Sequence, residues 1–439
     1  MNRFIKEVEK RILVYDGSKG YLLQKMGLAG GDCPELWNIK QAVKIKEIYM
    51  AYKDAGCDVI QTNTFQGNRV QLEKYSLGSM VYELNYQGAV LAKEVMGDNG
   101  FVAASVGPMG ELLEPLGELT FKKAYEIYKE QVTALVDGGV DIINFETFSD
   151  LAEMRAAFFA AKEVSDIPVI CSFAFESNGR TLMGTDPFTA AVVMKALGAE
   201  MIGANCSFGP DHMLGVIKKM HEAGGICLSV KPNAGIPEAV GGSIVYKETV
   251  ENFTKLAQEF ARHGARLIGG CCGTTPDYIK ALRERVEGME VPCLPEYRGN
   301  ALITSTVSCY DISNFPDANI GEINSDKDSN LIEALNGDDT ECIADMAMNL
   351  QGEEFDLIYI NIDTAMKDSR ILGELVKNVQ AYVKQPLVIE TKYPDALDYA
   401  LNAYNGRAGV IIKASSGENR KLLTETAEKY GSAIIKAGI

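Results

Sequence analysis

The chain has 439 residues, of which 46% are hydrophobic and 23% charged, and its formal net charge is −17. These values are typical of a soluble globular protein with a sizeable core, and the length corresponds to about two or three domains. The negative charge excludes nucleic acids and anionic membrane surfaces as expected partners. Residues 1–10 contain no apolar signal-peptide segment, and no later run is long enough for a membrane span. Because most of the ten cysteines lie in apolar segments, we expect reduced thiols and a cytoplasmic location.

The first two thirds of the chain alternate short apolar segments, each running into a turn, with amphipathic helical patterns. The helical patterns are clearest at 40–55, 121–136, 211–222 and 249–263. Near-continuous apolar strands that alternate with helices indicate a parallel sheet covered on its outside, and eight such units over about 280 residues predict a (β/α)8 TIM barrel. The eight expected strands are 12–15, 59–64, 101–108, 142–147, 169–173, 201–206, 226–233 and 267–272.

Polar residues and cysteines stand at the carboxyl ends of these expected strands. In a TIM barrel those ends share one mouth, where active sites are built, so residues far apart in the sequence should converge there. Asn63, Thr64 and Asn233 are explained equally well as turn-forming or barrel-capping residues and as residues that support the ligands of the site. Asn233 is also expected among the substrate-binding residues. The full set is Asp16, Asn63, Thr64, Glu146, Cys206, Asn233, Cys271 and Cys272.

Adjacent cysteines, Cys271 and Cys272, end the last strand before a helix that opens at Thr275-Pro276. Neighbouring cysteines rarely bond each other without strain, so they are better placed to hold something at the turn. Cys206 ends another strand and supplies a third thiol. Three thiolates with one open position are the arrangement of a catalytic zinc site, because a structural site uses four protein ligands. The other seven cysteines are expected to be core or surface thiols: Cys33, Cys57, Cys171, Cys227, Cys293, Cys309 and Cys342.

Four segments carry a resemblance to a known family: DGSKG at 16–20, GANCSFGP at 203–210, KPNAGIP at 231–237 and GGCCGTTP at 269–276. In this order they resemble the homocysteine S-methyltransferase family, specifically the zinc-bearing N-terminal module of cobalamin-dependent methionine synthase, over roughly residues 10 to 290. The resemblance implies a barrel that binds zinc through the three cysteines, with the homocysteine thiolate as fourth ligand.

The amino-acid end of such a substrate needs an anion for its ammonium and donors for its carboxylate. Asp16 and Glu146 are the expected ammonium partners, although each can also be a plain salt-bridge residue. The backbone N–H groups of Gly17 and Ser149 are the expected carboxylate donors, and the resemblance implies the same roles. The family's common Asp-Gly-Ala-Met-Gly reads Asp-Gly-Ser-Lys-Gly at 16–20, which predicts a change at the lip of the pocket.

Beyond the barrel, assigned to 1–295, we expect a linker or irregular arm at 296–340 and a smaller α/β region at 341–439. The last part resembles the opening half of the pterin-binding barrel of methionine synthases. It departs from that family where the strand-end Asp-x-Asn reads Tyr359-Ile360-Asn361, where a later Asp is Glu390, and where an Asn is Lys413. Folate binding is therefore not expected. A half barrel of about four strands leaves sheet edges that pairing, homo-oligomerisation or docking must cover.

These observations predict a zinc-dependent homocysteine S-methyltransferase that forms methionine. No cobalamin-binding module is visible in the sequence, so we expect methylcobalamin on a separate methyl-corrinoid protein as donor. The alternatives are transfer from S-methylmethionine or betaine, and a non-catalytic subunit that binds zinc or a corrinoid protein. Betaine requires an aromatic cage for its quaternary ammonium, and the single Trp37 does not establish one. The sequence leaves open the donor, the oligomeric state and whether Ile439 is the natural end.

Overall fold

The structure is a computed structural model that describes residues 2–240, 243–336, 340–351, 354–413 and 417–435. It divides into two compact units. The first comprises Met1–Met183 and Ala199–Glu296, and the second comprises Gly184–Gly198 and Tyr297–Ile439. Within the described residues, none of the helices combines the length and apolarity needed to cross a bilayer.

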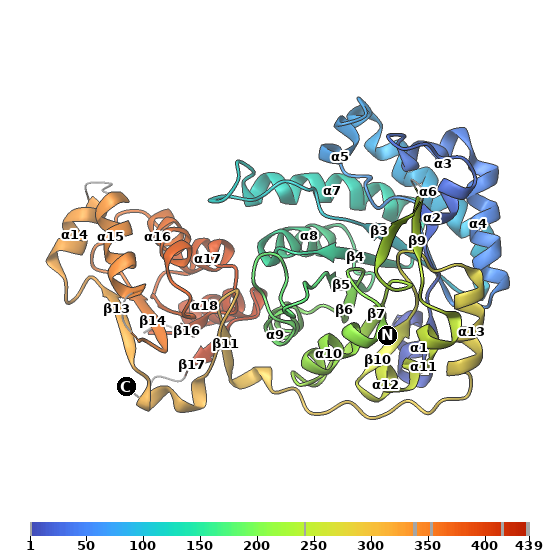
Figure 1. Ribbon diagram of the computed structural model, residues 1–439. Coiled ribbons are helices and arrows are strands. Elements are labelled where there is room, and N and C mark those ends of the chain that lie inside the picture. Colours follow the sequence, from blue (N-terminus) through green and yellow to red (C-terminus); the bar gives the residue numbers. More distant parts are fainter. Residues whose placement is uncertain (1, 241–242, 337–339, 352–353, 414–416, 436–439) are drawn as a thin grey trace. The chain divides into compact units, whose positions relative to one another are not determined.

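The first unit is built on an eight-stranded parallel sheet in the order β1-β10-β7-β6-β5-β4-β3-β2. An isolated parallel bridge between Tyr15 and Val59 joins the two ends of this order, so the sheet curves into a barrel (Figure 1). The predicted TIM-barrel fold is confirmed. The strands are β1 (Leu13–Val14), β2 (Val59–Gln61), β3 (Phe101–Val106), β4 (Ile142–Phe148), β5 (Val169–Phe173), β6 (Met201–Asn205), β7 (Cys227–Lys231) and β10 (Ala265–Ile268).

Helices surround these strands (Figure 1). They begin where the sequence supplies caps: Thr120 and Asp150 accept backbone hydrogen bonds in the first turns of α7 and α8, and Pro210 and Pro276 open α10 and α13. The helices are α1 (Arg3–Lys10), α2 (Lys19–Lys25), α3 (Trp37–Lys40), α4 (Ala42–Asp54), α5 (Arg69–Glu73), α6 (Val81–Met96), α7 (Phe121–Asp137), α8 (Leu151–Val164), α10 (Pro210–His221), α11 (Val250–Lys255), α12 (Ala257–Arg262) and α13 (Pro276–Val286).

The helix expected at 249–263 is divided. Leu256 ends α11 and begins α12, with φ −91° and ψ 1°, outside helical geometry. Each half still buries apolar residues, Phe253 in α11 and Phe260 in α12, so the apolar period of the sequence continues across the break in the helix. A short antiparallel hairpin, β8 (Pro237–Val240) with β9 (Ser243–Tyr246), precedes these helices.

The N-terminal end of the barrel is closed by α1. Its buried residues Phe4 and Val8 pack in one cluster with inward-facing residues of the strands, including Leu13, Met201 and Leu267. Burying a side chain of this size contributes about 2 kcal/mol. With this end filled by apolar side chains, the polar residues are left to the opposite, C-terminal mouth.

The second unit contains a five-stranded parallel sheet in sequential order, β13-β14-β15-β16-β17. Its helices are α9 (Pro187–Leu197), α14 (Ser329–Asn336), α15 (Thr340–Gln351), α16 (Arg370–Tyr382), α17 (Pro394–Ala403) and α18 (Gly417–Lys429). The strands are β13 (Ile320–Asn324), β14 (Leu357–Asn361), β15 (Leu387–Glu390), β16 (Gly409–Ile411) and β17 (Ala433–Ile435), with a separate hairpin of β11 (Leu302–Thr304) and β12 (Cys309–Asp311).

Residues 296–340, expected as an irregular arm, therefore contribute an edge strand to this sheet. Gly321 and Ile323 of β13 are buried, while Glu322 between them is exposed. An edge strand with one solvent-facing side needs no continuous apolar run, which is why the sequence pattern was weak. The sheet has five strands instead of about four.

Candidate metal centre

Three thiols meet at the mouth of the first unit. Cys206 directly follows β6, and Cys271 and Cys272 follow β10 within four residues, while β7 lies between these two strands. The three sulfur atoms lie within 4.8 Å of one another, and the Cys206 and Cys272 sulfurs are 3.8 Å apart. Thiolates bound at 2.3 Å to one tetrahedral zinc ion would be separated by about 3.8 Å. The donor set and its spacing fit such an ion.

The end of β7 fixes both cysteine segments. The backbone N–H of Cys206 donates to the carbonyl of Lys231 at 3.0 Å, and the N–H of Cys271 donates to the carbonyl of Pro232 at 2.8 Å. The side-chain oxygen of Asn233 accepts from the N–H of Cys272 at 3.0 Å. The segment that ends β7 therefore fixes the backbone of all three cysteines. The buried Asn233 contacts the cysteine backbone.

Two residues at this site adopt backbone angles that only glycine takes easily. Cys206 has φ 64° and Ser207 has φ 62°, both in the left-handed region. Such residues are strained by about 1–3 kcal/mol each, and they persist where surrounding contacts over-determine them. The hydrogen bond from the Phe208 N–H to the Cys206 carbonyl, 2.8 Å, is one such contact.

The glycines flanking the two adjacent cysteines allow close approach. A Cβ at Gly270 would overlap Thr274, and a Cβ at Gly273, where φ is 79°, would overlap the ring of Tyr246. The Thr274 hydroxyl donates to the Cys271 carbonyl at 2.7 Å and closes the turn. The sequence GGCCG is thus required by packing on both sides of the thiols.

Mutual contact and burial make the three thiols difficult to ionise by themselves. The hydrogen bond with Cys271 lowers the pKa of Cys206, but the hydrogen bond with Cys272 and burial raise that pKa to about 11. The hydrogen bond with Cys206 lowers the pKa of Cys272, whereas the hydrogen bond with Cys271, its charge and burial raise it to about 12. Three thiolates at this spacing require a compensating cation, as a bound metal provides.

Asp16 lies fully buried at the end of β1. Its Oδ2 accepts from the backbone N–H of Gln61 at 2.9 Å and from the ammonium of Lys19 at 3.2 Å. Burial raises the pKa of Asp16, and the charge of Lys19 opposes that shift. Its Oδ1 is buried without a hydrogen-bond partner among the residues that the structure describes. This oxygen can therefore accept a hydrogen bond from a ligand.

Glu146 is held on both oxygens. Gln61 Nε2 donates to Oε1 at 2.7 Å, Ser105 Oγ donates to the same oxygen, and the ammonium of Lys231 pairs with Oε2. The Lys231 side chain is only 2% exposed and also donates to Gln61 Oε1 at 2.7 Å. Burial raises the pKa of Glu146, but the charges of Lys231 and Lys19 bring it below its ordinary value. Glu146 is therefore ionised and internally paired.

Three further residues that the sequence placed at the mouth have the following positions. Gly17 is buried, and a Cβ there would lie 2.8 Å from Thr274 Oγ1, so it packs against the cysteine turn. Ser149 is half-buried between β4 and Asp150, the N-cap of α8. Asn63 bonds the Pro34 carbonyl at 2.8 Å and Asn38 Oδ1 at 3.0 Å.

Of the other cysteines, Cys33, Cys57 and Cys171 are buried, Cys227 is partly buried, and Cys293 and Cys309 are exposed. The side chain of Cys342 lies outside the described residues.

Sequence reasoning assigned no partner to five polar residues of the mouth, although it had marked the segment that contains Lys19 as a change at the lip of the pocket. Asn205 donates to Thr147 Oγ1 at 2.8 Å, and its Nδ2 lies 3.9 Å from the Cys271 sulfur. Asn205 and Lys231 could have been recognised as site residues, since both end apolar strands and lie in the recognised motifs. A position at the end of a strand does not, however, predict which residue a side chain will contact. The five are Lys19, Gln61, Ser105, Asn205 and Lys231.

A third buried carboxylate, Glu153 on α8, makes stability depend on pH. Its Oε1 accepts from the Met109 N–H at 2.7 Å and from the Tyr128 hydroxyl at 2.6 Å, and burial raises its pKa from 4.5 to about 7. The folded state thus holds the proton more tightly, so this contribution to stability is complete below pH 4.5 and is lost as pH rises through about 7. The difference corresponds to about 3 kcal/mol at most.

We expect Glu153→Gln to remove that dependence, because the amide oxygen can still accept both hydrogen bonds without ionising. The free energy of unfolding in urea, measured at pH 5 and pH 8, should fall less with pH in the variant than in the wild type. Glu163→Gln, at an exposed position of the same helix, controls for the loss of one charge. Equal pH dependence in wild type and Glu153→Gln would contradict the prediction.

Comparison with known proteins identifies the family. The sequence model of the homocysteine S-methyltransferase family matches residues 13–286. The chain belongs to this family. The sequence-based identification is thus confirmed, and the match covers the barrel with its three thiols.

The chain also resembles curated relatives and a solved structure. It is 31% identical over 300 residues to methionine synthase of Mycobacterium leprae (strain TN), covering 64% of this chain and 25% of that protein. It is 28% identical over 426 residues to methionine synthase of Mycobacterium tuberculosis (strain ATCC 25618 / H37Rv), covering 92% of this chain and 35% of that protein. The chain therefore spans about a quarter to a third of the length of these relatives. The metallated form of the Escherichia coli homocysteine methyltransferase MmuM matches in fold, with a TM-score of 0.55 and 23% identity over 64% of this chain and 99% of that chain.

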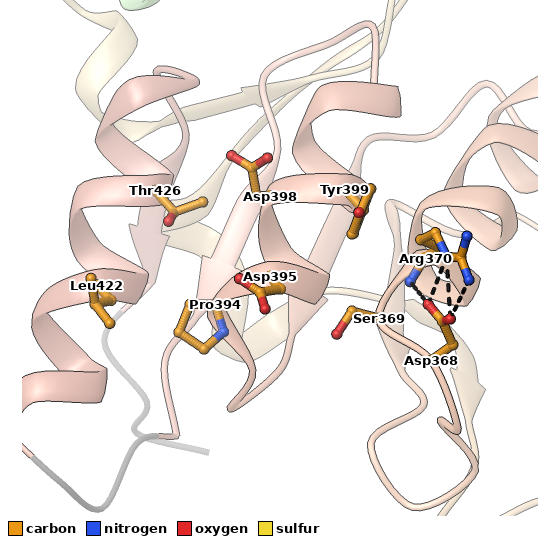
Figure 2. A pocket seen from close by; sticks show the side chains of 9 residues that line it. All are labelled: Asp368, Ser369, Arg370, Pro394, Asp395, Asp398, Tyr399, Leu422 and Thr426. Carbon is orange, nitrogen blue, oxygen red and sulfur yellow. Dashed lines mark hydrogen bonds and ion pairs between the residues drawn. The ribbon is translucent and has the colours of Figure 1, made fainter.

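The second unit has a groove of its own between α16, α17 and α18 (Figure 2). Two of its carboxylates are paired at the surface: Asp368 accepts from Arg370, as the dashed lines in Figure 2 show, and Asp398 pairs with Lys429 at 2.8 Å. These are solvated ion pairs of small energetic weight. Among the described residues, the group that could hold a metal ion is the three-thiol cluster of the barrel.

The departures from the pterin-binding pattern contact one another in the second unit. Glu390 at the end of β15 is buried, and its Oε1 accepts from Asn361 Nδ2 at 2.9 Å and from the Lys413 ammonium at 2.6 Å. The Asn361 amide also lies 3.3 Å from the Tyr359 hydroxyl. The polar groups of this edge are joined in one internal network.

Proposed function

We propose that this protein is a zinc-dependent homocysteine S-methyltransferase that forms methionine. The observation that carries the proposal is the cluster of Cys206, Cys271 and Cys272, whose sulfurs fit three corners of a zinc tetrahedron. Three protein ligands leave the fourth position to a substrate, as in catalytic zinc sites. Family membership over residues 13–286 supports homocysteine as that substrate.

Zinc bound by three thiolates lowers the pKa of an incoming thiol while leaving its sulfur electron-rich and nucleophilic. The residues of the chain bind and orient the acceptor. Asp16 Oδ1, the unpartnered oxygen, accepts from the substrate ammonium. Glu146 supports this end of the site through its ion pair with Lys231, and the backbone N–H groups of Gly17 and Ser149 serve the carboxylate. Asn233 positions the cysteine turn by accepting from the Cys272 N–H.

In the transfer itself, the homocysteine thiol gives up its proton to solvent, and its sulfur attacks the methyl carbon in line. The new S–C bond forms as the bond between the methyl group and its carrier breaks, and the carrier leaves with the electron pair. A methylcobalamin carrier would leave as cob(I)alamin. We propose that it is presented by a separate methyl-corrinoid protein in the cytoplasm, and the similarity of the chain to methionine synthases supports a corrinoid donor.

The proposal is tested by zinc content together with methionine formation from homocysteine. We expect about one zinc per chain and turnover with a methylated corrinoid protein or free methylcobalamin. Turnover with S-methylmethionine or betaine alone would move the function to a corrinoid-independent transferase. Zinc without turnover from any of these donors would favour a non-catalytic binding subunit, and absence of zinc would contradict the proposal.

A further inference from the structure

Lys19 is an unusual residue for this mouth, because the family's common motif has methionine there. It is the first residue of α2, and four residues separate it from the end of β1. Its side chain is only 12% exposed, and its ammonium lies 3.2 Å from Asp16 Oδ2. The charge of Lys19 lowers the pKa of both Asp16 and Glu146. A buried cation has thus been placed where the resemblance implies an apolar residue.

This cation changes what the two acids can accept. Glu146 is engaged on both oxygens, and Asp16 is engaged on Oδ2. Within the described part of the chain, Asp16 Oδ1 is the oxygen of these two acids that remains buried and unpartnered. An ammonium ligand at the mouth should therefore bind Oδ1. There it would lie beside the like charge of Lys19, which disfavours binding unless an anion lies between them.

An α-amino acid supplies that anion in the required position. Its ammonium and carboxylate leave the same carbon atom, just as the two oxygens of Asp16 do. A ligand whose nitrogen binds Oδ1 therefore lays its carboxylate alongside the group that binds Oδ2, namely Lys19. A lysine ammonium has three donors, and the structure shows one of them used, on Asp16. The Asp16 carboxylate, the ligand ammonium, the ligand carboxylate and the Lys19 ammonium then form a closed ring in which positive and negative charges alternate.

We propose that Lys19 is a specificity-determining residue that binds the α-carboxylate of the acceptor and selects thiols that carry both an ammonium and a carboxylate. This inference rests on the proposed function, since it takes homocysteine as the acceptor. It adds a side-chain cation to the carboxylate site, for which sequence reasoning had offered only the backbone N–H groups of Gly17 and Ser149.

The test is calorimetric titration of the zinc-loaded protein with L-homocysteine and with 3-aminopropane-1-thiol, which has the same chain but lacks the carboxylate. For Lys19→Met we expect homocysteine to bind about 30-fold more weakly, the loss of a hydrogen bond between charged groups. The amine thiol should bind equally well or more tightly, because the like charge is gone. Lys19→Arg should bind homocysteine with an affinity within about 5-fold of the wild type, because arginine is also a cation that can bind a carboxylate. Lys25→Met, at an exposed position of the same helix, should leave both affinities unchanged.

A loss of affinity for homocysteine without a loss for the amine thiol separates this role from structural damage, which would weaken both. Equal weakening of both thiols, or no change in either, would overturn the inference. Because binding is measured without a methyl donor, a failure of methyl transfer does not affect the result. Wild-type protein that fails to bind homocysteine would instead refute the proposed function and this inference together. Where turnover is measured, Lys19→Met should raise KM for homocysteine and leave kcat unchanged.

Discussion

Cys272→Ala is expected to lose zinc and, with it, methyl transfer. The sulfur of Cys272 is 3.8 Å from that of Cys206 and completes the three-thiol group. Sharing the roughly 10–16 kcal/mol of a four-ligand zinc site among its ligands gives about 3 kcal/mol for each. Zinc affinity should therefore fall by about 100-fold or more, and turnover by at least about 1,000-fold, because the remaining ligands no longer hold the thiol acceptor in an ordered site.

The measurements are competition with a zinc chelator, followed by a chromophoric indicator, and the initial rate of methionine formation. Cys293→Ala is the matched control, since it removes an exposed thiol from the same unit and should change neither quantity. A thermal melt of each metal-free variant separates lost coordination from lost folding. Retention of zinc affinity within about 5-fold in Cys272→Ala would show that Cys272 is not a ligand.

Lys231→Met is expected to lower the free energy of unfolding by about 3–5 kcal/mol, because it leaves the carboxylate of Glu146 buried without its cation. The Lys231 and Glu146 side chains are 2% and 8% exposed, so water cannot replace the lost partner. The expected magnitude is several times that of a surface pair, which is worth about 0–1 kcal/mol.

A double-mutant cycle tests this prediction. Lys231→Met combined with Glu146→Gln removes both charges and should recover most of the stability that Lys231→Met loses, while Gln can still accept from Ser105 and Gln61. Lys129→Met, which breaks the exposed pair with Glu163, is the control and should cost less than about 1 kcal/mol. Urea unfolding of the wild type, Lys231→Met, Glu146→Gln and the double variant gives the four values of the cycle. A loss below about 1 kcal/mol for Lys231→Met, or no recovery in the double variant, would contradict the buried ion pair.

The barrel was predictable because its signal is repetitive. Each strand is a short apolar run followed by a turn and an amphipathic helix, and parallel strands put all their carboxyl ends at one mouth. That rule alone brings Cys206 toward Cys271 and Cys272, and the structure places the three sulfurs within 4.8 Å of one another. Prediction failed where the pattern was weak. The strand β13 was not predicted because it is an edge strand whose residues alternate in exposure. The break at Leu256 was not predicted because the spacing of apolar residues continues across it.

The sequence by itself determined the order of strands, the end of the barrel where polar residues gather, and the three thiols at that end. Only the tertiary structure decided which charges pair there. Lys231 meets Glu146 across 85 positions of sequence, Gln61 bridges both, and Lys19 takes one oxygen of Asp16 and leaves the other free. The physical reason is that the burial of a residue follows from the spacing of apolar residues within its own segment, which can be read from the sequence. The partner of a buried charge depends instead on the curvature and stagger that bring different strands within hydrogen-bonding distance.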